Sequence, residues 1–129
     1  MREYLTEAVV LNQDYLNDLD VRVDLYTRDF GRLKAKARSL KKTTSKLAGH
    51  LEPLTLSRVR LVEKNGLSVT DALTITRFDK SQESLRLLGF FRENVLEGEP
   101  DLALWQWLKD SLLSGEISYD SLNKQLGIL

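Results

Sequence analysis

The period of the hydrophobic side chains changes once along the chain, near Phe78, and this change constrains the fold more than any other feature. Before Phe78, apolar and polar residues alternate with the two-residue period of half-buried strands. After it, apolar residues recur at helical spacing. Strands first and helices afterwards argue against a parallel α/β sheet, in which the two alternate. We therefore expect a mainly β, α+β protein with its helices at the C-terminal end.

Five strand-like segments precede the change, at residues 4–11, 19–26, 32–38, 54–62 and 67–76. Asp29–Gly31 predicts a turn, and Asn65-Gly66 is a strong hairpin signal. In the fourth segment the apolar phase slips near Ser57, as an extra residue in a β-bulge would cause. In the fifth, the alternation predicts that Leu73 and Ile75 face inward. Five antiparallel strands of this length favour a small closed barrel, and a five-stranded OB-fold is the leading candidate.

Two or three short helices are expected after the barrel. Ser81 is a good N-cap for the first, and Gly98 marks its end. Pro100 suits the first turn of a second helix that ends near Gly115, and a third follows at residues 118–125. We divide the chain into an OB-fold barrel, residues 1–79, and a short helical region, residues 80–129.

The charge is unevenly distributed although the formal net charge is zero. Between Arg28 and Lys64, eleven Lys and Arg stand against three Asp and Glu, which leaves +8, and the flanks cancel it. Seven of these cations, and no acid, lie between Arg32 and Lys46. Alternate residues on a strand place cations about 6.5–7 Å apart on one face, close to the spacing of phosphates in an extended single strand. The pattern favours a polyanion-binding surface, although lysines on an edge strand also serve solubility.

The candidate DNA-binding residues are the cations of this segment and its one histidine, and two rings are candidates for stacking bases. For His50, a structural hydrogen bond is the other interpretation, and Tyr26 and Phe30 taken individually fit the core better than a stacking role. The DNA-binding candidates are Arg28, Arg32, Lys34, Lys36, Arg38, Lys41, Lys42, Lys46, His50, Arg58 and Arg60.

Several other functional classes are disfavoured. The chain has no Cys and one His, so neither a Cys-based zinc site nor a multi-His metal site is expected, and no cofactor is implied. No catalytic triad or carboxylate pair is evident, and we expect a protein that is not an enzyme. No apolar run is long enough for a membrane span, and the acids near the N-terminus do not fit a signal peptide. A cytoplasmic, nucleoid-associated protein is expected.

Three stretches resemble one family: Tyr4–Leu11, Leu25–Leu33 and Ser45–Leu54. The second contains Gly-Arg-Leu and the third Lys-Leu-x-Gly-His-Leu-x-Pro, and the match runs in order from Tyr4 to about Gly115. This is the bacterial recombination mediator and DNA repair protein family RecO. The resemblance implies an N-terminal OB-fold that binds single- and double-stranded DNA, followed by a helical domain. It also implies strand annealing, and cooperation with RecR to displace single-stranded DNA-binding protein (SSB) so that RecA can load, without a nucleotide or covalent step.

The family's basic surface carries over onto the matching positions from Arg32 to Lys46. Typical members are longer and continue into a larger helical domain, often with a four-Cys zinc module, which commonly receives the SSB tail. We therefore expect residues 80–129 to be a truncated helical domain. The barrel is expected to make the contacts with DNA and with RecR, and the SSB contact is expected less than these two. The alternative is an adaptor module that docks a protein partner and has little DNA affinity of its own.

Overall fold

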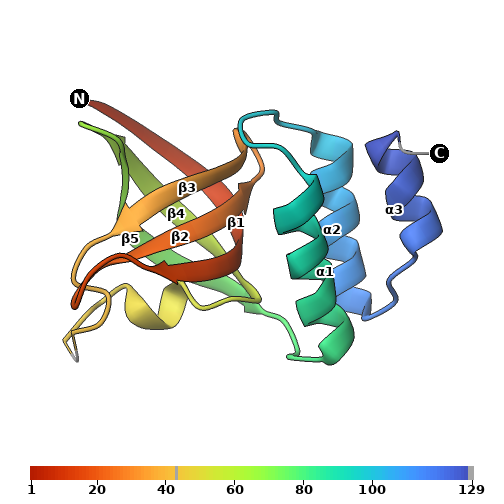
Figure 1. Ribbon diagram of the computed structural model, residues 1–129, viewed down its shortest axis with the longest axis horizontal. Helices are drawn as coiled ribbons and strands as arrows, with labels where there is room; N and C mark the ends of the chain where they lie inside the picture. Colours follow the sequence, from red (N-terminus) through yellow and green to blue (C-terminus); the bar gives the residue numbers. More distant parts are fainter. Residues whose placement is uncertain (43, 128–129) are drawn as a thin grey trace.

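The computed structural model describes residues 1–42 and 44–127 and contains a closed five-stranded barrel with three helices packed on one side (Figure 1). The strand order around the barrel is β1-β2-β3-β5-β4, with β4 pairing back onto β1. All pairings are antiparallel except that of β3 with β5, which closes the barrel at Lys36 and Ser68. The predicted OB-fold barrel with C-terminal helices is confirmed. The elements are β1 Arg2–Tyr15, β2 Val21–Thr27, β3 Gly31–Ala37, η1 Ala48–His50, β4 Thr55–Glu63, β5 Leu67–Arg77, α1 Gln82–Asn94, α2 Leu102–Ser114 and α3 Tyr119–Leu126.

The first strand is longer than the sequence pattern predicts. β1 continues to Tyr15, because residues 12–15 pair with β2 after a bulge at Leu11. These residues are polar or exposed, so the apolar signal ends although the backbone pairing does not. The predicted turns are both present, with Gly31 at φ 71° as the first residue of β3 and Asn65-Gly66 at positive φ between β4 and β5. Gly31 is required, because a Cβ there would lie 2.6 Å from the backbone of Glu99.

The phase slip in β4 arises because the strand faces two hydrophobic cores. Val59 and Leu61 fill the barrel interior, whereas Leu56 points outward into the core beneath the helices. β1 is shared in the same way: Ala8 and Val10 face inward while Val9 and Leu11 face the helices. Two-sided burial explains why apolar residues are consecutive there. Bulges do occur where β4 pairs with β5, but their extra residues lie on β5, at Thr70 and Ile75.

The bulge at Thr70 reverses the inward phase of β5. Ala72 is buried, whereas Leu73 is 64% exposed and Ile75 46% exposed. The prediction that Leu73 and Ile75 face inward is therefore wrong, because an extra residue turns every following side chain to the opposite face.

The predicted N-cap of α1, Ser81, is confirmed. Ser81 and Ser118 accept hydrogen bonds from the N–H groups of Ser84 and Ser121, and α2 ends at Gly115 in the left-handed conformation. Asp101 caps α2, so Pro100 lies before the helix and not, as predicted, in its first turn. α1 ends before Gly98, at Asn94. In the part of the chain that the structure describes, no helix is long and apolar enough to cross a membrane.

The helices bury the outer face of the barrel along β1, β2 and the start of β4. Phe91 and Trp105 pack against Tyr26, with ring centroids 5.3 and 6.2 Å away. α1 and α2 lie directly on the strands, and α3 packs outside α2 (Figure 1). The faces of the barrel away from this layer are left for other contacts.

Candidate nucleic-acid interface

A hollow of about 640 Å³ is lined in part by two loops, and both loops lie at the end of the barrel away from the helices (Figure 1). Its walls are β3, the loop between β1 and β2, and the hairpin loop between β4 and β5. In OB-folds, the β2–β3 face and these two loops bind oligonucleotides. Within the described residues, no acidic side chain lines the hollow. Five cations line it: Arg22, Lys34, Lys36, Arg38 and Lys64.

Two of these cations face each other directly across the sheet. Arg22 on β2 is paired with Lys36 on β3, on the outer face of the barrel. Like charges in opposed positions are destabilising unless something of opposite charge lies between them. Lys34 lies two residues before Lys36 on β3, and Arg38 lies two residues after it, directly beyond the end of the strand. Lys64 lines the hollow from the loop between β4 and β5. The arrangement is suited to binding a polyanion such as a phosphate backbone.

Lys34, Lys36 and Arg38 thus lie where the sequence predicted them, but Arg22 and Lys64 were missed as site residues. Arg22 lies between Asp20 and Asp24 in the sequence, so it does not belong to a run of cations there. A signal was available, because the turn at residues 28–30 fixes the hairpin register and places Arg22 opposite Lys36. A second hollow of about 380 Å³ adjoins the first, sharing Arg38, Lys64 and Ser68, and extends along β5.

Of the three loop lysines, Lys41 contacts a residue that lines the hollow. Lys41 donates a hydrogen bond to the carbonyl of Asn17, which is itself a lining residue. Lys42 and Lys46 are exposed on the same loop. Asp20 lies in the neighbouring β1–β2 loop, and the hydrogen bond from the Ser39 N–H lowers its pKa. The carboxylate therefore orients the chain that leaves β3.

Arg32 is not available to a ligand, which corrects the sequence prediction for it. Its guanidinium makes a two-pronged ion pair with Asp24, at 2.8 and 3.0 Å, and donates to the carbonyl of Val95 at 2.9 Å. The side chain is 12% exposed and that of Asp24 3%. The hydrogen bond to Asp24 raises the pKa of Arg32. This residue joins β2 and β3 to the end of α1, and its role is structural.

The two rings predicted to stack bases both lie outside the basic hollow. Tyr26 is fully buried beneath α1 and α2, and its hydroxyl has no hydrogen-bond partner. Burial raises its pKa, with a further contribution from the charge of Asp101. Phe30 is half-buried in an edge-on contact with Tyr4, with centroids 5.1 Å apart. The sequence prediction of a stacking role is wrong for Tyr26, and Phe30 lies outside the basic hollow.

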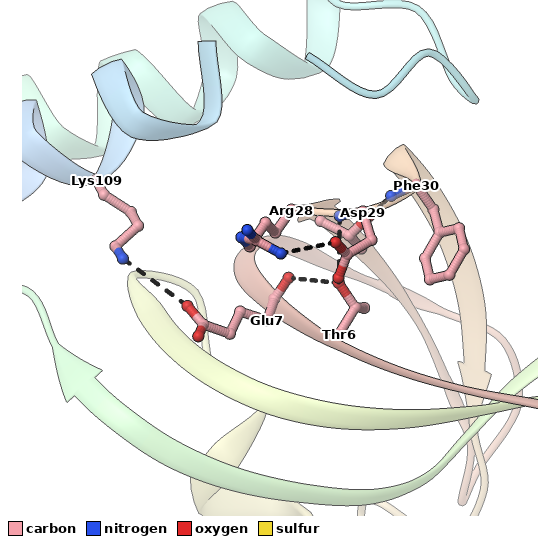
Figure 2. Close-up of polar contacts among 7 residues, drawn as sticks. Thr6, Glu7, Arg28, Asp29, Phe30 and Lys109 are labelled. Atoms are coloured by element: carbon pink, nitrogen blue, oxygen red, sulfur yellow. Dashed lines mark hydrogen bonds and ion pairs between the residues drawn. The ribbon is translucent and has the colours of Figure 1, made fainter. Parts of the chain in front are cut away.

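Arg28 lies in a different environment from the hollow, among acids. It pairs with Asp29 at 2.9 Å, while Thr6 donates to the same carboxylate. Lys109 reaches from α2 to within 3.8 Å of Glu7, as Figure 2 shows. Arg28 and Lys109 each thus have an acidic partner.

Arg58 and Arg60 lie on the outer face of β4, apart from the five cations of the hollow. Arg58 is opposite Glu7 on one side and Leu73 on the other. Arg60 is opposite Leu5 and Asp71. Both arginines are exposed, on a face that mixes charged and apolar side chains.

His50 has a structural role in the barrel. Its Nδ1 accepts a hydrogen bond from the Thr74 N–H at 3.0 Å, and the Thr74 hydroxyl lies 2.6 Å from the same nitrogen. The His50 carbonyl accepts from Ser57. These contacts attach η1 to β4 and β5, so the structural interpretation accounts for the residue. No group of metal-ligating side chains suited to a metal ion is present in residues 1–42 and 44–127.

Comparison with known proteins places the chain in a family. Residues 1–78 match the family model described as "Recombination protein O N terminal". The chain belongs to the RecO family. The match covers all five strands of the barrel and ends before α1.

Similar proteins named "DNA repair protein RecO" occur in several bacteria. The Nocardioides sp. protein is 40% identical over 60% of this chain and 32% of its own length. That of Pelotomaculum thermopropionicum is 32% identical over 87% of this chain and 47% of its length. That of Syntrophobacter fumaroxidans is 31% identical over 98% of this chain and 54% of its length. The chain therefore spans between a third and about a half of the length of these relatives.

Proposed function

We propose that this chain binds single- and double-stranded DNA without sequence preference through the basic hollow, as part of recombinational DNA repair. The observation that carries the proposal is the hollow itself: five cations converge there, none of them within an ion pair that the structure records. Phosphate contacts of this kind position a strand without reading its bases. Membership of the RecO family supports the repair context.

The proposal includes the further roles that the family resemblance implies. The barrel would assist annealing of complementary strands and the loading of a recombinase, together with a RecR-like protein. None of these steps requires covalent chemistry, and we propose that the chain is not an enzyme. The SSB contact is not part of the proposal for this chain.

The direct test is fluorescence anisotropy with a labelled single-stranded oligonucleotide at several salt concentrations. If all five cations neutralise phosphates of a single strand, log K falls against log salt with a slope of about −3.5. Replacing Lys34 and Lys36 by Glu should weaken binding at least tenfold. It should also make the slope shallower, at about −2 or closer to zero, because two phosphate contacts are lost.

A matched control reverses the same number of charges elsewhere. Arg58→Glu with Arg60→Glu changes the net charge equally, but on the outer face of β4. Binding by this variant should stay within a few-fold of the unsubstituted protein. Equal losses in the two double variants would show that only total charge matters and would refute the assignment to the hollow.

The adaptor function is the second candidate, and one observation favours it. Leu5 and Leu73 are 63% and 64% exposed on the β1-β4-β5 face, on either side of Arg58 and Arg60. Apolar side chains beside arginines are typical of protein interfaces. Retention of a RecR-like partner, together with no oligonucleotide affinity at low salt, would favour the adaptor over the DNA-binding function.

A further inference from the structure

Tyr15 is the one aromatic side chain in the described residues that is largely exposed. Its exposure is 72%, whereas the other rings are buried or half-buried. It stands at the very end of β1, immediately before Leu16 and Asn17, which line the basic hollow. Tyr15 is thus a solvent-exposed ring beside the cations of the hollow, and it makes no contribution to either hydrophobic core.

The ring is held in place from two sides. Its hydroxyl donates to the Asp18 carboxylate at 3.3 Å. The ammonium of Lys41 lies 4.3 Å from the ring centroid, in cation–π geometry, and is also bonded to the Asn17 carbonyl at 3.2 Å. Because Asn17 is a wall of the hollow, the Tyr15–Lys41 pair lies at its rim.

The charges around Tyr15 differ from those inside the hollow. Asp14, Asp18 and Asp20 lie on the same strand end and loop, and each accepts a hydrogen bond from a neighbouring polar group. A phosphate placed directly on the ring would meet these carboxylates. A base is uncharged and carries amino groups that can donate to carboxylates, so it suits this position.

We infer that Tyr15 is a stacking platform for one unpaired base of a strand whose phosphates occupy the basic hollow. Lys41 lies over the ring and Asp18 fixes its tilt. The exposed ring surface takes the base. The inference rests on the proposed function and deepens it, because it gives the site a preference for unpaired bases that a row of cations lacks. In a duplex the bases are already stacked on one another, so Tyr15 favours single strands.

The test compares Tyr15→Leu with Tyr15→Phe on two labelled probes of equal length, an oligothymidine strand and a strand carrying abasic sites in place of bases. Stacking on one aromatic ring changes affinity about fivefold to a hundredfold. Tyr15→Leu should weaken oligothymidine binding by this factor, leave the abasic strand unaffected and leave the salt slope unchanged. Tyr15→Phe keeps the ring and should bind like the unsubstituted protein. Photo-crosslinking through 5-iodouracil should place the adduct on Tyr15.

The outcomes separate this inference from the proposed function. If the unsubstituted protein binds and the Lys34→Glu, Lys36→Glu variant does not, while Tyr15→Leu binds oligothymidine normally, stacking is overturned and the hollow stands. Equal weakening of the abasic strand by Tyr15→Leu would also overturn it. If the unsubstituted protein binds neither probe at low salt, the proposed function fails, and the stacking role with it.

Discussion

The buried ion pair between Arg32 and Asp24 allows a stability prediction of definite size. Replacing Asp24 by Leu removes the carboxylate and leaves a guanidinium that is 12% exposed without its partner. Breaking a buried pair on one side costs about 3–5 kcal/mol. With an unfolding entropy of about 2.1 cal/mol/K per residue, a chain of this length loses roughly 4 °C of Tm per kcal/mol. Asp24→Leu should therefore lower Tm by about 11–18 °C.

The matched variants are Arg32→Met and the double variant Asp24→Leu, Arg32→Met. Arg32→Met leaves the Asp24 carboxylate, which is 3% exposed, without its partner and should cost a similar free energy of unfolding. The second replaces both charges by apolar groups of similar volume and should recover most of the loss. It also removes the donor to the Val95 carbonyl, which limits the recovery by about 1–3 kcal/mol. Urea unfolding followed by circular dichroism, with a thermal scan, measures all three.

Two results would refute the reasoning. A loss below about 1 kcal/mol for either single variant would mean that the pair behaves like an exposed one. Normal stability of Arg32→Met, combined with weakened oligonucleotide binding and a flatter salt slope, would return Arg32 to the DNA interface. The structure instead leads us to expect an unchanged salt slope for any variant of Arg32 that folds.

Two further predictions concern stability. Gly31→Ala should cost about 2 kcal/mol or more, because a left-handed residue is strained and its Cβ would lie 2.6 Å from the Glu99 backbone. Gly115→Ala has a similar φ with open space around it and should cost less; equal urea midpoints for the two would contradict the contact. The Ser39 N–H lowers the pKa of Asp20 from 3.8, so the stability it contributes is present above that pH and lost as pH falls through the folded pKa. Asp20→Asn should therefore lower the urea midpoint at pH 7 and much less at pH 2, and an equal effect at both would refute this.

Features set by local chemistry could be predicted from the sequence. The period change near Phe78 separates barrel from helices because side-chain direction repeats differently in strands and helices. The hairpin at Asn65-Gly66 and the cap at Ser81 follow from backbone preferences of single residues. Lys34 and Lys36 point outward because the small apolar residues between them fill the barrel.

Features set by tertiary pairing could not be predicted. Nothing near Tyr26 in the sequence shows that helices from the far end of the chain bury it. In the sequence, Arg32 resembles its neighbouring cations, and only the pairing of β2 with β3 brings Asp24 within hydrogen-bond distance of it. Tyr15 lay beyond the end of the apolar pattern in β1, where a loop was expected and a ring had no evident role.

The sharing of strands between two cores bears on how this protein should be cut for study. The family model ends at residue 78, just before the helices. A fragment that ends there would expose Val9, Leu11, Tyr26 and Leu56, which the helices bury in the intact structure. Such a piece would be prone to self-association, and its apparent affinity for DNA would be confounded by aggregates. The smallest unit suitable for binding experiments therefore includes α1 and α2 as well as the strands.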